Sequence, residues 1–422
     1  MIQILKFKKQ SIDNLEIALT FIIFIYYLGL DISGQLTQAW ALFGFVVVPI
    51  LISRCWKHYF WVLTRNLPIL IALIVIPAST LWSTTPDATL AYSRAFVCST
   101  AFGIYLAARY TPQQYMKQLA WIFGISIFLN LLVPLLMPGY GTDGEVWKGI
   151  TRHKNELSAA MALAGTFCFT HALYGNKKHR WLAWLGLVVA FFILLRTQGK
   201  GSLGIFVGLL TILPLNQIIK QQYKLRTCLI ITALFITVVV GVTVTLNFEY
   251  IVVDLLGKDL GFNGREQLWN YLIDRGMQRP WLGYGYAGFW TDLDEGRAVA
   301  VSFPWIGGAG DGGGNAHSSY MDIFLQLGWL GLSLVAITLT ITLAQITLLL
   351  GVTKQNEFFW MLQSSLFLAI TSYYESYGGF FAFRHIFWVL YVSHSCYAAI
   401  NFHRIFITRQ KSLWKPENSL VM

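Results

Sequence analysis

Residues 318–350 read SSYMDIFLQLGWLGLSLVAITLTITLAQITLLL, and Asp322 is the single charged residue of this run. An α-helix needs about 20 consecutive apolar residues to cross a lipid bilayer. Because this run is longer than one crossing requires, we expect its helix either to tilt or to begin outside the bilayer. Similar apolar runs recur along the chain, and together they predict an all-α membrane protein.

The composition agrees with a multi-pass membrane protein. The 422 residues are 56% hydrophobic and 12% charged, whereas soluble proteins carry about 25% charged residues. The net charge of +11 does not indicate nucleic-acid binding, because most basic residues fall in short segments between apolar runs. We predict one integral membrane domain over 1–422, with about twelve spans near 15–30, 36–53, 66–83, 89–108, 117–137, 155–174, 180–195, 202–219, 225–246, 318–350, 355–374 and 382–402.

The basic residues predict the orientation, since cytoplasmic segments carry an excess of Lys and Arg. With both termini inside, the inner segments hold 19 of the 31 Lys and Arg residues, Arg94 lies within a span, and 11 are outside. The outer ones are clustered, at Lys148, Arg152, Lys154, Arg196, Lys200, Lys258, Arg265, Arg275, Arg279, Arg297 and Arg384. Clustered positive charge on the outer face indicates an anionic ligand there.

The hydrophilic stretch 247–316 precedes the run quoted above and is the longest loop of the chain. Membrane proteins usually keep their loops short, and binding and catalytic residues concentrate on loops. We therefore expect this loop to lie on the outer face and to carry the active site. Its distinctive elements are Gly264-Arg265-Glu266, Arg279-Pro280-Trp281-Leu282-Gly283-Tyr284-Gly285 and, at its exit, Asn315-Ala316-His317-Ser318-Ser319-Tyr320.

Several outer cations are candidates for binding a phosphate or diphosphate. Arg152 and Lys154, beside Asn155, precede the sixth span, Lys200 follows the seventh, and Arg265 opens the loop motif. Guanidinium groups bind phosphate oxygens in a bidentate fork, and such charge-assisted bonds are strong. The alternative for each cation alone is an anchor to lipid headgroups.

Three further ionisable residues are candidates. His317 lies where the tenth span begins and could move a proton near neutral pH, or could simply cap or pack. Arg94 is costly within a span unless it pairs or faces a cavity, and Glu375 could be its partner or a base. The alternative for both residues is a polar contact between helices.

The loop also holds aromatic and acidic side chains. Arg279, Trp281 and Tyr284 are assigned to substrate binding, and Trp281 and Trp290 are the rings expected to stack on sugars. Asp292-Leu293-Asp294-Glu295 resembles a paired-acid metal motif, but a solvated loop tip is the stronger interpretation. The five cysteines lie in or beside spans without metal-ligand spacing, so neither a metal nor a cofactor is expected.

In order and spacing, these elements resemble the O-antigen ligase/polymerase superfamily of bacterial envelope glycan enzymes, and within it the ExoQ-type exopolysaccharide polymerases. The resemblance covers most of the second half of the chain. Its elements are His153-Lys154-Asn155, Gln198-Gly199-Lys200-Gly201-Ser202, Gly264-Arg265 with Trp269, Pro280-x-x-Gly283-x-Gly285 with Phe289, Ala316-His317-Ser318-Ser319-Tyr320 with Gly328 and Gly331, and Glu375-Ser376. The chain departs from the family where Ser318 replaces an Asn and around Lys200, where the expected serines are missing.

The resemblance implies a GT-C-like membrane glycosyltransferase fold with a large periplasmic loop between spans nine and ten. The donor would be a glycan on undecaprenyl diphosphate, and the acceptor a sugar hydroxyl on a second lipid-linked glycan or on lipid A core. Arg265 would stabilise the leaving diphosphate with Lys200, Arg152 or Lys154, and with Arg94 as a further ligand. His317 would act on the acceptor hydroxyl as base or, if cationic, bind the diphosphate.

We predict a metal-independent polysaccharide polymerase of the bacterial inner membrane that works with its active site in the periplasm. A flippase and a chain-length regulator would be its natural partners. The alternatives are a ligase that transfers the glycan to lipid A core and, from another class, a small-anion transporter. A transporter would place charges deep in several spans and show repeat symmetry, and we find neither in the sequence.

Overall fold

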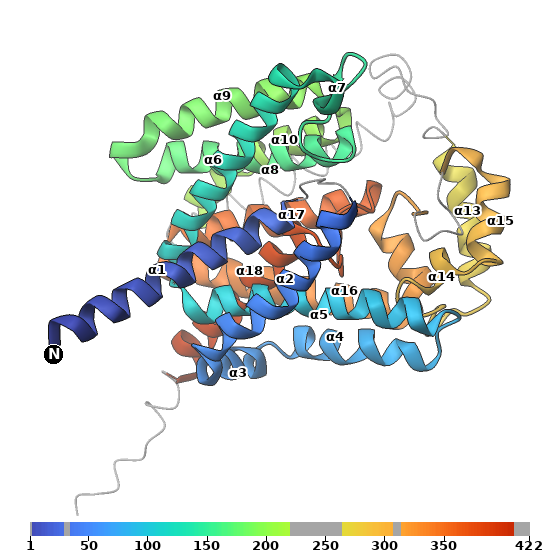
Figure 1. Cartoon of the computed structure of the whole chain (residues 1–422), viewed down its shortest axis with the longest axis horizontal. Coiled ribbons are helices and arrows are strands. Elements are labelled where there is room, and N and C mark those ends of the chain that lie inside the picture. Colours follow the sequence, from blue (N-terminus) through green and yellow to red (C-terminus); the bar gives the residue numbers. More distant parts are fainter. Residues whose placement is uncertain (1, 29–33, 220–263, 307–313, 409–422) are drawn as a thin grey trace, which may run out of the picture.

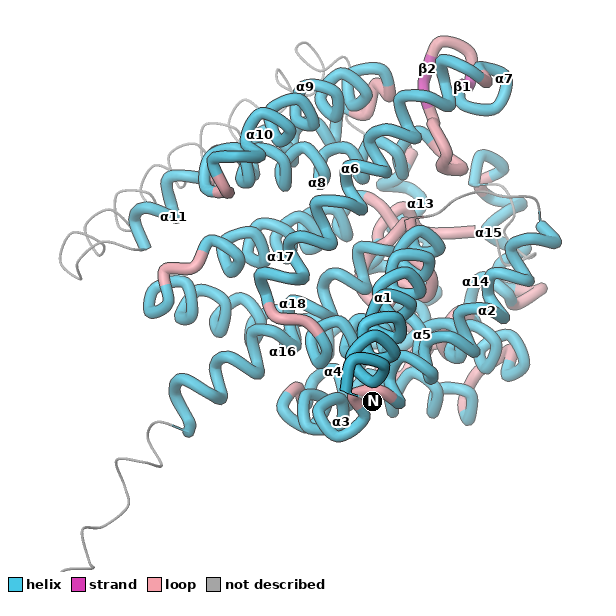
Figure 2. Tube along the Cα trace, turned by 60° about the vertical axis from the view of Figure 1, so that its left-hand side comes forward, coloured by secondary structure: helices cyan, strands magenta, loops and turns pink. Residues whose placement is uncertain are grey.

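The structure is a computed structural model that describes residues 2–28, 34–219, 264–306 and 314–408 (Figure 1). Within these ranges the chain is helical apart from turns, loops and one two-stranded hairpin (Figure 2), which confirms the all-α prediction. The predicted ninth span, 225–246, and the first part of the long loop, 247–263, lie outside the described residues.

The helices and strands follow one another along the chain in two described stretches. The first contains α1 Ile2–Tyr27, α2 Gly34–Ser53, α3 Trp56–Arg65, α4 Leu67–Ala78, η1 Ser79–Leu81, α5 Pro86–Arg109, α6 Pro112–Leu136, α7 Pro138–Gly141, β1 Thr142–Asp143, β2 Val146–Trp147, α8 Lys154–Tyr174, η2 Lys177–His179, α9 Arg180–Arg196, α10 Lys200–Thr211 and α11 Leu213–Ile219. The second contains α13 Arg265–Gly276, α14 Gly288–Thr291, α15 Glu295–Ser302, η4 Pro304–Ile306, α16 Ser319–Thr353, α17 Asn356–Tyr374, α18 Ile386–Phe402 and η5 His403–Thr408. Strands β1 and β2 pair antiparallel, with Thr142 opposite Trp147.

Each predicted apolar segment within the described residues coincides with a helix. Six of the described helices are long and apolar enough to cross a membrane, or seven if one bent pair is counted as a single span. The chain is therefore a multi-pass membrane protein, whereas twelve crossings remain a prediction.

The bent pair is formed by α2 and α3, which meet at an angle of 97°. The predicted spans 36–53 and 66–83 leave the residues between them as a short inner loop, yet Lys57 and Arg65 of this stretch lie on helix α3. This helix buries Tyr59 and Val62 on one side and exposes Phe60 on the other. Hydropathy averaged over a window does not detect so short an amphipathic helix.

Helix α18 lies in the middle of the protein, and every residue from Ile386 to Ile400 is buried. It packs against α3, α5, α16 and α17. Close packing with α5 depends on Gly103, because a Cβ there would come within 2.8 Å of the Cβ of Val392. Helices α6, α8, α9 and α10 form a second group, and α13 to α15 lie at one end of the molecule (Figure 1).

Helix α16 is interrupted at Gly328, where φ is 59° and ψ is −151°. The break removes two helical hydrogen bonds, those from Trp329 N to Leu325 O and from Leu330 N to Gln326 O. The four backbone groups freed by the break bind the segment 280–285 instead. Leu325 O accepts from Tyr284 N at 2.9 Å, and Gln326 O accepts from Gly285 N at 2.9 Å. Trp329 N donates to Pro280 O at 2.8 Å, and Leu330 N donates to Trp281 O at 3.2 Å. A broken helix is tolerated in a membrane protein when other backbone groups satisfy it. The Pro280-x-x-Gly283-x-Gly285 motif and Gly328 therefore form one structural unit.

We expect Gly328→Ala to destabilise the protein by about 1–3 kcal/mol or more, because its backbone conformation is accessible essentially to glycine alone. The added Cβ would also meet the Pro280 carbonyl oxygen. Thermal unfolding of the purified protein in detergent should show a lowered Tm. Gly204→Ala in α10 is the matched control, since a Cβ there has no heavy atom within 4 Å and should leave the Tm unchanged or raise it. Equal Tm values for the two variants would contradict this role of the break.

Candidate functional site

Four helix ends far apart in the sequence converge on one site. They are the starts of α8, α10 and α13 and the end of α17, which carry Asn155, Lys200, Arg265 and Glu375 respectively. The charge pattern assigned all four ends to the same face of the membrane, and the contacts described below join them.

Arg265 is the first residue of α13, directly after Gly264, whose φ is 82°. Its Nη1 donates to the carbonyl oxygen of Tyr374 at 2.5 Å, and its Nη2 lies 3.5 Å from Glu375 Oε1. Asn155 Nδ2 donates to the same oxygen at 2.9 Å. The Glu375 side chain is 7% exposed and that of Arg265 is 21% exposed. A buried carboxylate therefore orients the guanidinium and leaves part of it accessible.

Glu375 is thus the partner of Arg265 and not of Arg94, for which the sequence analysis considered it. The exposed Arg94 donates from its Nε to Leu90 O in its own helix at 3.3 Å. Described contacts do not bring Arg94 to the site, so its role as a further phosphate ligand stays a prediction.

His317 lies two residues before the start of α16, with a positive φ of 50°. Its backbone N donates to Asn315 Oδ1 at 3.0 Å, and its ring stacks on Trp305 with centroids 5.7 Å apart. Burial, assisted by the nearby charges of Arg265 and His153, lowers the pKa of His317 to about 4. The imidazole is therefore neutral at pH 7, and its Nδ1 is buried without a hydrogen-bond partner among the described residues.

Lys200 begins α10 at the same place. Ser202 Oγ lies 2.8 Å from Ser158 Oγ of α8, and Gly201 faces the ring of Tyr374, which a Cβ would approach to 3.1 Å. The Lys200 side chain is exposed. Small residues around Lys200 thus let α8, α10 and α17 meet, and the start of α10 adjoins Tyr374, whose carbonyl oxygen binds Arg265.

The His153-Lys154-Asn155 element opens helix α8. His153 Nδ1 accepts from Asn155 N at 3.2 Å and caps the helix, which positions Asn155 toward Glu375. Lys154 is the first residue of α8, and Arg152 lines a neighbouring cavity. All three segments that resemble the family's cation-bearing motifs therefore lie together.

The structure gives the other predicted binding residues different surroundings. The Arg279 guanidinium lies over the ring of Tyr284 at 4.9 Å. Tyr284 is 2% exposed, and its hydroxyl donates to Arg275 O at 3.0 Å. Trp281 is 73% exposed and belongs to the segment that repairs the α16 break. These contacts favour a packing role for Tyr284. The predicted roles of Arg279, Trp281 and Tyr284 in substrate binding remain predictions.

The acidic run 292–295 has a structural explanation. Asp292 Oδ1 accepts from the backbone N of Asp294 (2.9 Å) and of Glu295 (3.3 Å) at the start of α15. Glu295 lies 3.6 Å from Arg275 Nη1. Among the described residues no group of three or more His, Cys, Asp or Glu side chains has the arrangement of a metal site.

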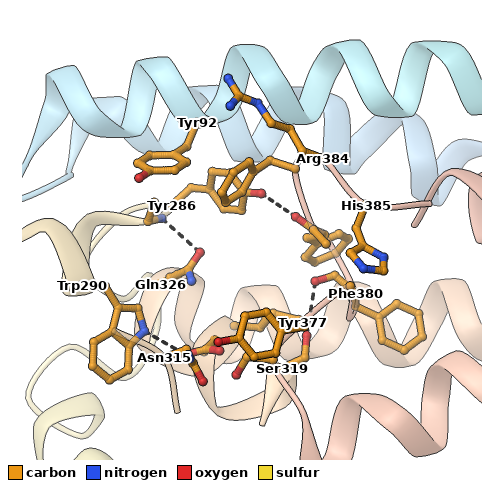
Figure 3. A pocket seen from close by; sticks show the side chains of 18 of the residues that line it. Tyr92, Tyr286, Trp290, Asn315, Ser319, Gln326, Tyr377, Phe380, Arg384 and His385 are labelled. Carbon is orange, nitrogen blue, oxygen red and sulfur yellow. Dashed lines mark hydrogen bonds between the residues drawn. The ribbon is translucent and has the colours of Figure 1, made fainter. Parts of the chain in front are cut away.

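A cavity of about 530 Å³ adjoins this site (Figure 3). It is lined by residues from α1, from α5, from the start of α8, from α14 and the residues before it, from the start of α16 and from the loop 376–385. They include Tyr92, Trp290, Asn315, Gln326, Tyr377 and Arg384. Sequence reasoning counted Arg384 among the outer cations but did not make it a candidate. The unusual outer charge was the only signal available, since the other lining residues are brought together by the tertiary fold.

Comparison with known proteins agrees with the motif resemblance. Residues 184–336 match the family model described as O-antigen ligase. This match agrees with the motifs quoted above and supports a relation of the chain to the O-antigen ligase/polymerase superfamily. The matched family implies a glycosyltransferase-like ligase or polymerase activity on lipid-linked glycans in a membrane. None of the curated proteins matches the chain.

The part of the chain that matches the superfamily includes Lys200, Arg265 and His317 but neither Asn155 nor Glu375. The structure nevertheless joins these last two to Arg265. A closer relation to the ExoQ-type members remains a prediction.

Proposed function

We propose that this protein is a polysaccharide polymerase that transfers a glycan from undecaprenyl diphosphate to a sugar hydroxyl of a second lipid-linked repeat unit. The observation that supports this most strongly is the oriented Arg265, held by Glu375 and Tyr374, with the neutral His317 close by. A cation and an unprotonated base in one site suit the departure of a diphosphate and the activation of a hydroxyl.

In the transfer, the bond between the anomeric carbon and the diphosphate oxygen breaks, and the electron pair leaves with the diphosphate. The acceptor oxygen forms the new glycosidic bond, and its proton passes to His317. Arg265 stabilises the charge that develops on the leaving oxygen, with Lys200, Lys154 and Arg152 as further phosphate ligands. Binding and orienting two large substrates would supply much of the rate.

Glu375 and Asn155 act by positioning Arg265. A guanidinium that is fixed before the substrate arrives needs little rearrangement during the reaction, which is how preorganised charges lower a barrier. Glu375→Gln would keep the shape but remove the charge, so we expect weaker transfer without unfolding.

We further propose that the site faces the periplasm from the inner membrane, that both termini are cytoplasmic, and that 247–316 is the large periplasmic loop that carries the site. The charge bias of the sequence supports this orientation. Chain-length regulator and flippase remain the expected partners.

The second candidate is the ligase that transfers the glycan to lipid A core, because the matching family model is described as an O-antigen ligase. A small-anion transporter has less support. Its cations should follow a path through the spans, whereas the cations described here meet at helix ends.

Complementation of a strain that lacks the gene tests this proposal, with surface glycan separated on a gel. Wild type should restore a ladder of long chains, and Arg265→Ala should leave single repeat units at matched expression. Arg297→Ala, an exposed arginine on α15, is the control and should restore the ladder. If the deletion strain still makes polymer and only its attachment to lipid A core is lost, the ligase replaces the polymerase.

A further inference from the structure

The cavity beside the cation site is separate from Arg265 and Glu375, neither of which lines it. Asn315 and Tyr377 both line the cavity, and Tyr377 follows Glu375 by two residues in the chain. Asn315 also accepts from the backbone of His317 at 3.0 Å. A ligand in the cavity would therefore lie against residues adjacent to the proposed base.

The lining is suited to a saccharide. The volume of about 530 Å³ is within the roughly 300–1,000 Å³ of small-molecule sites. Aromatic rings of Tyr92, Tyr286, Trp290 and Tyr377 surround it together with polar groups (Figure 3). A sugar ring presents apolar C–H faces, which can pack on aromatic rings, and hydroxyl groups, which can hydrogen-bond with polar side chains.

Two polar groups on the cavity are available to a ligand. Gln326 Oε1 accepts from Ala287 N at 3.0 Å, while its Nε2 makes no hydrogen bond with any described residue. The Tyr92 hydroxyl likewise has no hydrogen-bond partner within the described part of the chain. The Tyr286 hydroxyl, by contrast, is already bound to Phe381 O. One amide donor and one hydroxyl thus remain for recognition.

Two arginines and two carboxylates line the cavity, and both carboxylates already have partners within the protein. Glu156 lies 3.6 Å from His385, and the buried Asp322 accepts from Trp290 Nε1 at 2.8 Å and from Ala316 N at 3.0 Å. Arg152 also lines the cavity. Arg384 forms no ion pair or hydrogen bond with any described residue, and its side chain is exposed. An anionic group on the ligand would complete this arrangement.

We propose that this cavity binds the acceptor saccharide and that Arg384 recognises a carboxylate on it, so that the acceptor is an acidic sugar. This inference rests on the proposed function, since it places the acceptor hydroxyl beside His317 and the donor diphosphate at Arg265. Arg384 is thus a specificity residue for the acceptor, while Gln326 and Tyr92 bind its hydroxyl groups.

Calorimetry on the full-length protein in lipid nanodiscs tests the inference with three probes. These are a disaccharide that ends in glucuronic acid, the same disaccharide ending in glucose, and inorganic diphosphate. Wild type should bind the acidic disaccharide, and Arg384→Gln should weaken that binding about tenfold or more, the loss expected for one charge-assisted bond. Binding of the neutral disaccharide should be weaker and unaffected by Arg384→Gln.

Two further variants make the result decisive. Arg297→Gln removes an exposed arginine away from the cavity and should bind like wild type. Tyr92→Phe removes only the hydroxyl and should weaken both disaccharides. The inference is overturned if neither disaccharide binds, if Arg384→Gln binds the acidic one as well as wild type does, or if Arg384 supports diphosphate binding instead. If Arg265→Ala loses the glycan ladder in complementation while Arg384→Gln binds the acidic disaccharide like wild type, only this inference is rejected. If the wild-type protein makes no polymer at all, the proposed function is rejected.

Discussion

Arg265→Ala is expected to lower the rate of glycan transfer about a hundredfold or more, the loss seen when one preorganised donor is removed from a developing anion. The guanidinium is held by the Tyr374 carbonyl at 2.5 Å and faces Glu375 at 3.5 Å, so its position is fixed before substrate binds. Initial rates measured with purified protein would give the size of the effect.

Arg265→Lys separates charge from geometry. Lysine keeps the positive charge but cannot form the bidentate fork, so partial activity is expected. Arg297→Ala controls for the loss of one arginine from the same loop. An Arg265→Ala enzyme as fast as the Arg297→Ala enzyme would rule out a role for Arg265 in the reaction.

His317→Ala is expected to lower transfer about 10²- to 10⁴-fold, the usual contribution of a general base. A second readout distinguishes the base from a phosphate ligand. Burial and the neighbouring positive charges lower the pKa of His317 to about 4, so the ring is neutral at pH 7. A base is active when neutral, so wild-type activity should stay level on the acid side of neutrality and fall only as pH approaches about 4.

The pH profile would have the opposite slope if His317 acted as a cation. Activity would then rise as pH falls through the same range, because protonation would create the binding charge. The profile is best recorded as kcat/KM, which reports ionisation of the free enzyme. A rise toward low pH would assign His317 to diphosphate binding and leave the base unidentified.

The apolar runs of the sequence predicted the helices well. In lipid, a spanning segment must satisfy its backbone hydrogen bonds within itself, and an α-helix does so. Arg265, Asn155 and Glu375 were all named as candidates from their motifs. Their mutual contact could not be predicted, because it depends on how α8, α13 and α17 pack. For the same reason Glu375 was considered as a partner for Arg94, although the structure pairs it with Arg265.

Other features depend still more on tertiary structure. The sequence shows the glycines at 283, 285 and 328 but not that segment 280–285 fills the gap in α16. The cavity is assembled from six separate parts of the chain, and its cation, Arg384, has no motif around it. Positive charge on the outer face was the only sequence feature that pointed to both the Arg265 site and the cavity. It made Arg265 a candidate residue, whereas Arg384 was only counted among the outer cations.

The most direct test of the transfer reaction uses purified protein in nanodiscs with a synthetic undecaprenyl-diphosphate-linked repeat unit as the sole substrate. Free undecaprenyl diphosphate and saccharide length are measured together by chromatography. We predict that wild type and Arg297→Ala release one undecaprenyl diphosphate for each linkage formed, and that Arg265→Ala and His317→Ala release almost none. Release of undecaprenyl diphosphate at the wild-type rate by Arg265→Ala, or failure of wild type to lengthen the saccharide, would contradict polymerase chemistry at this site.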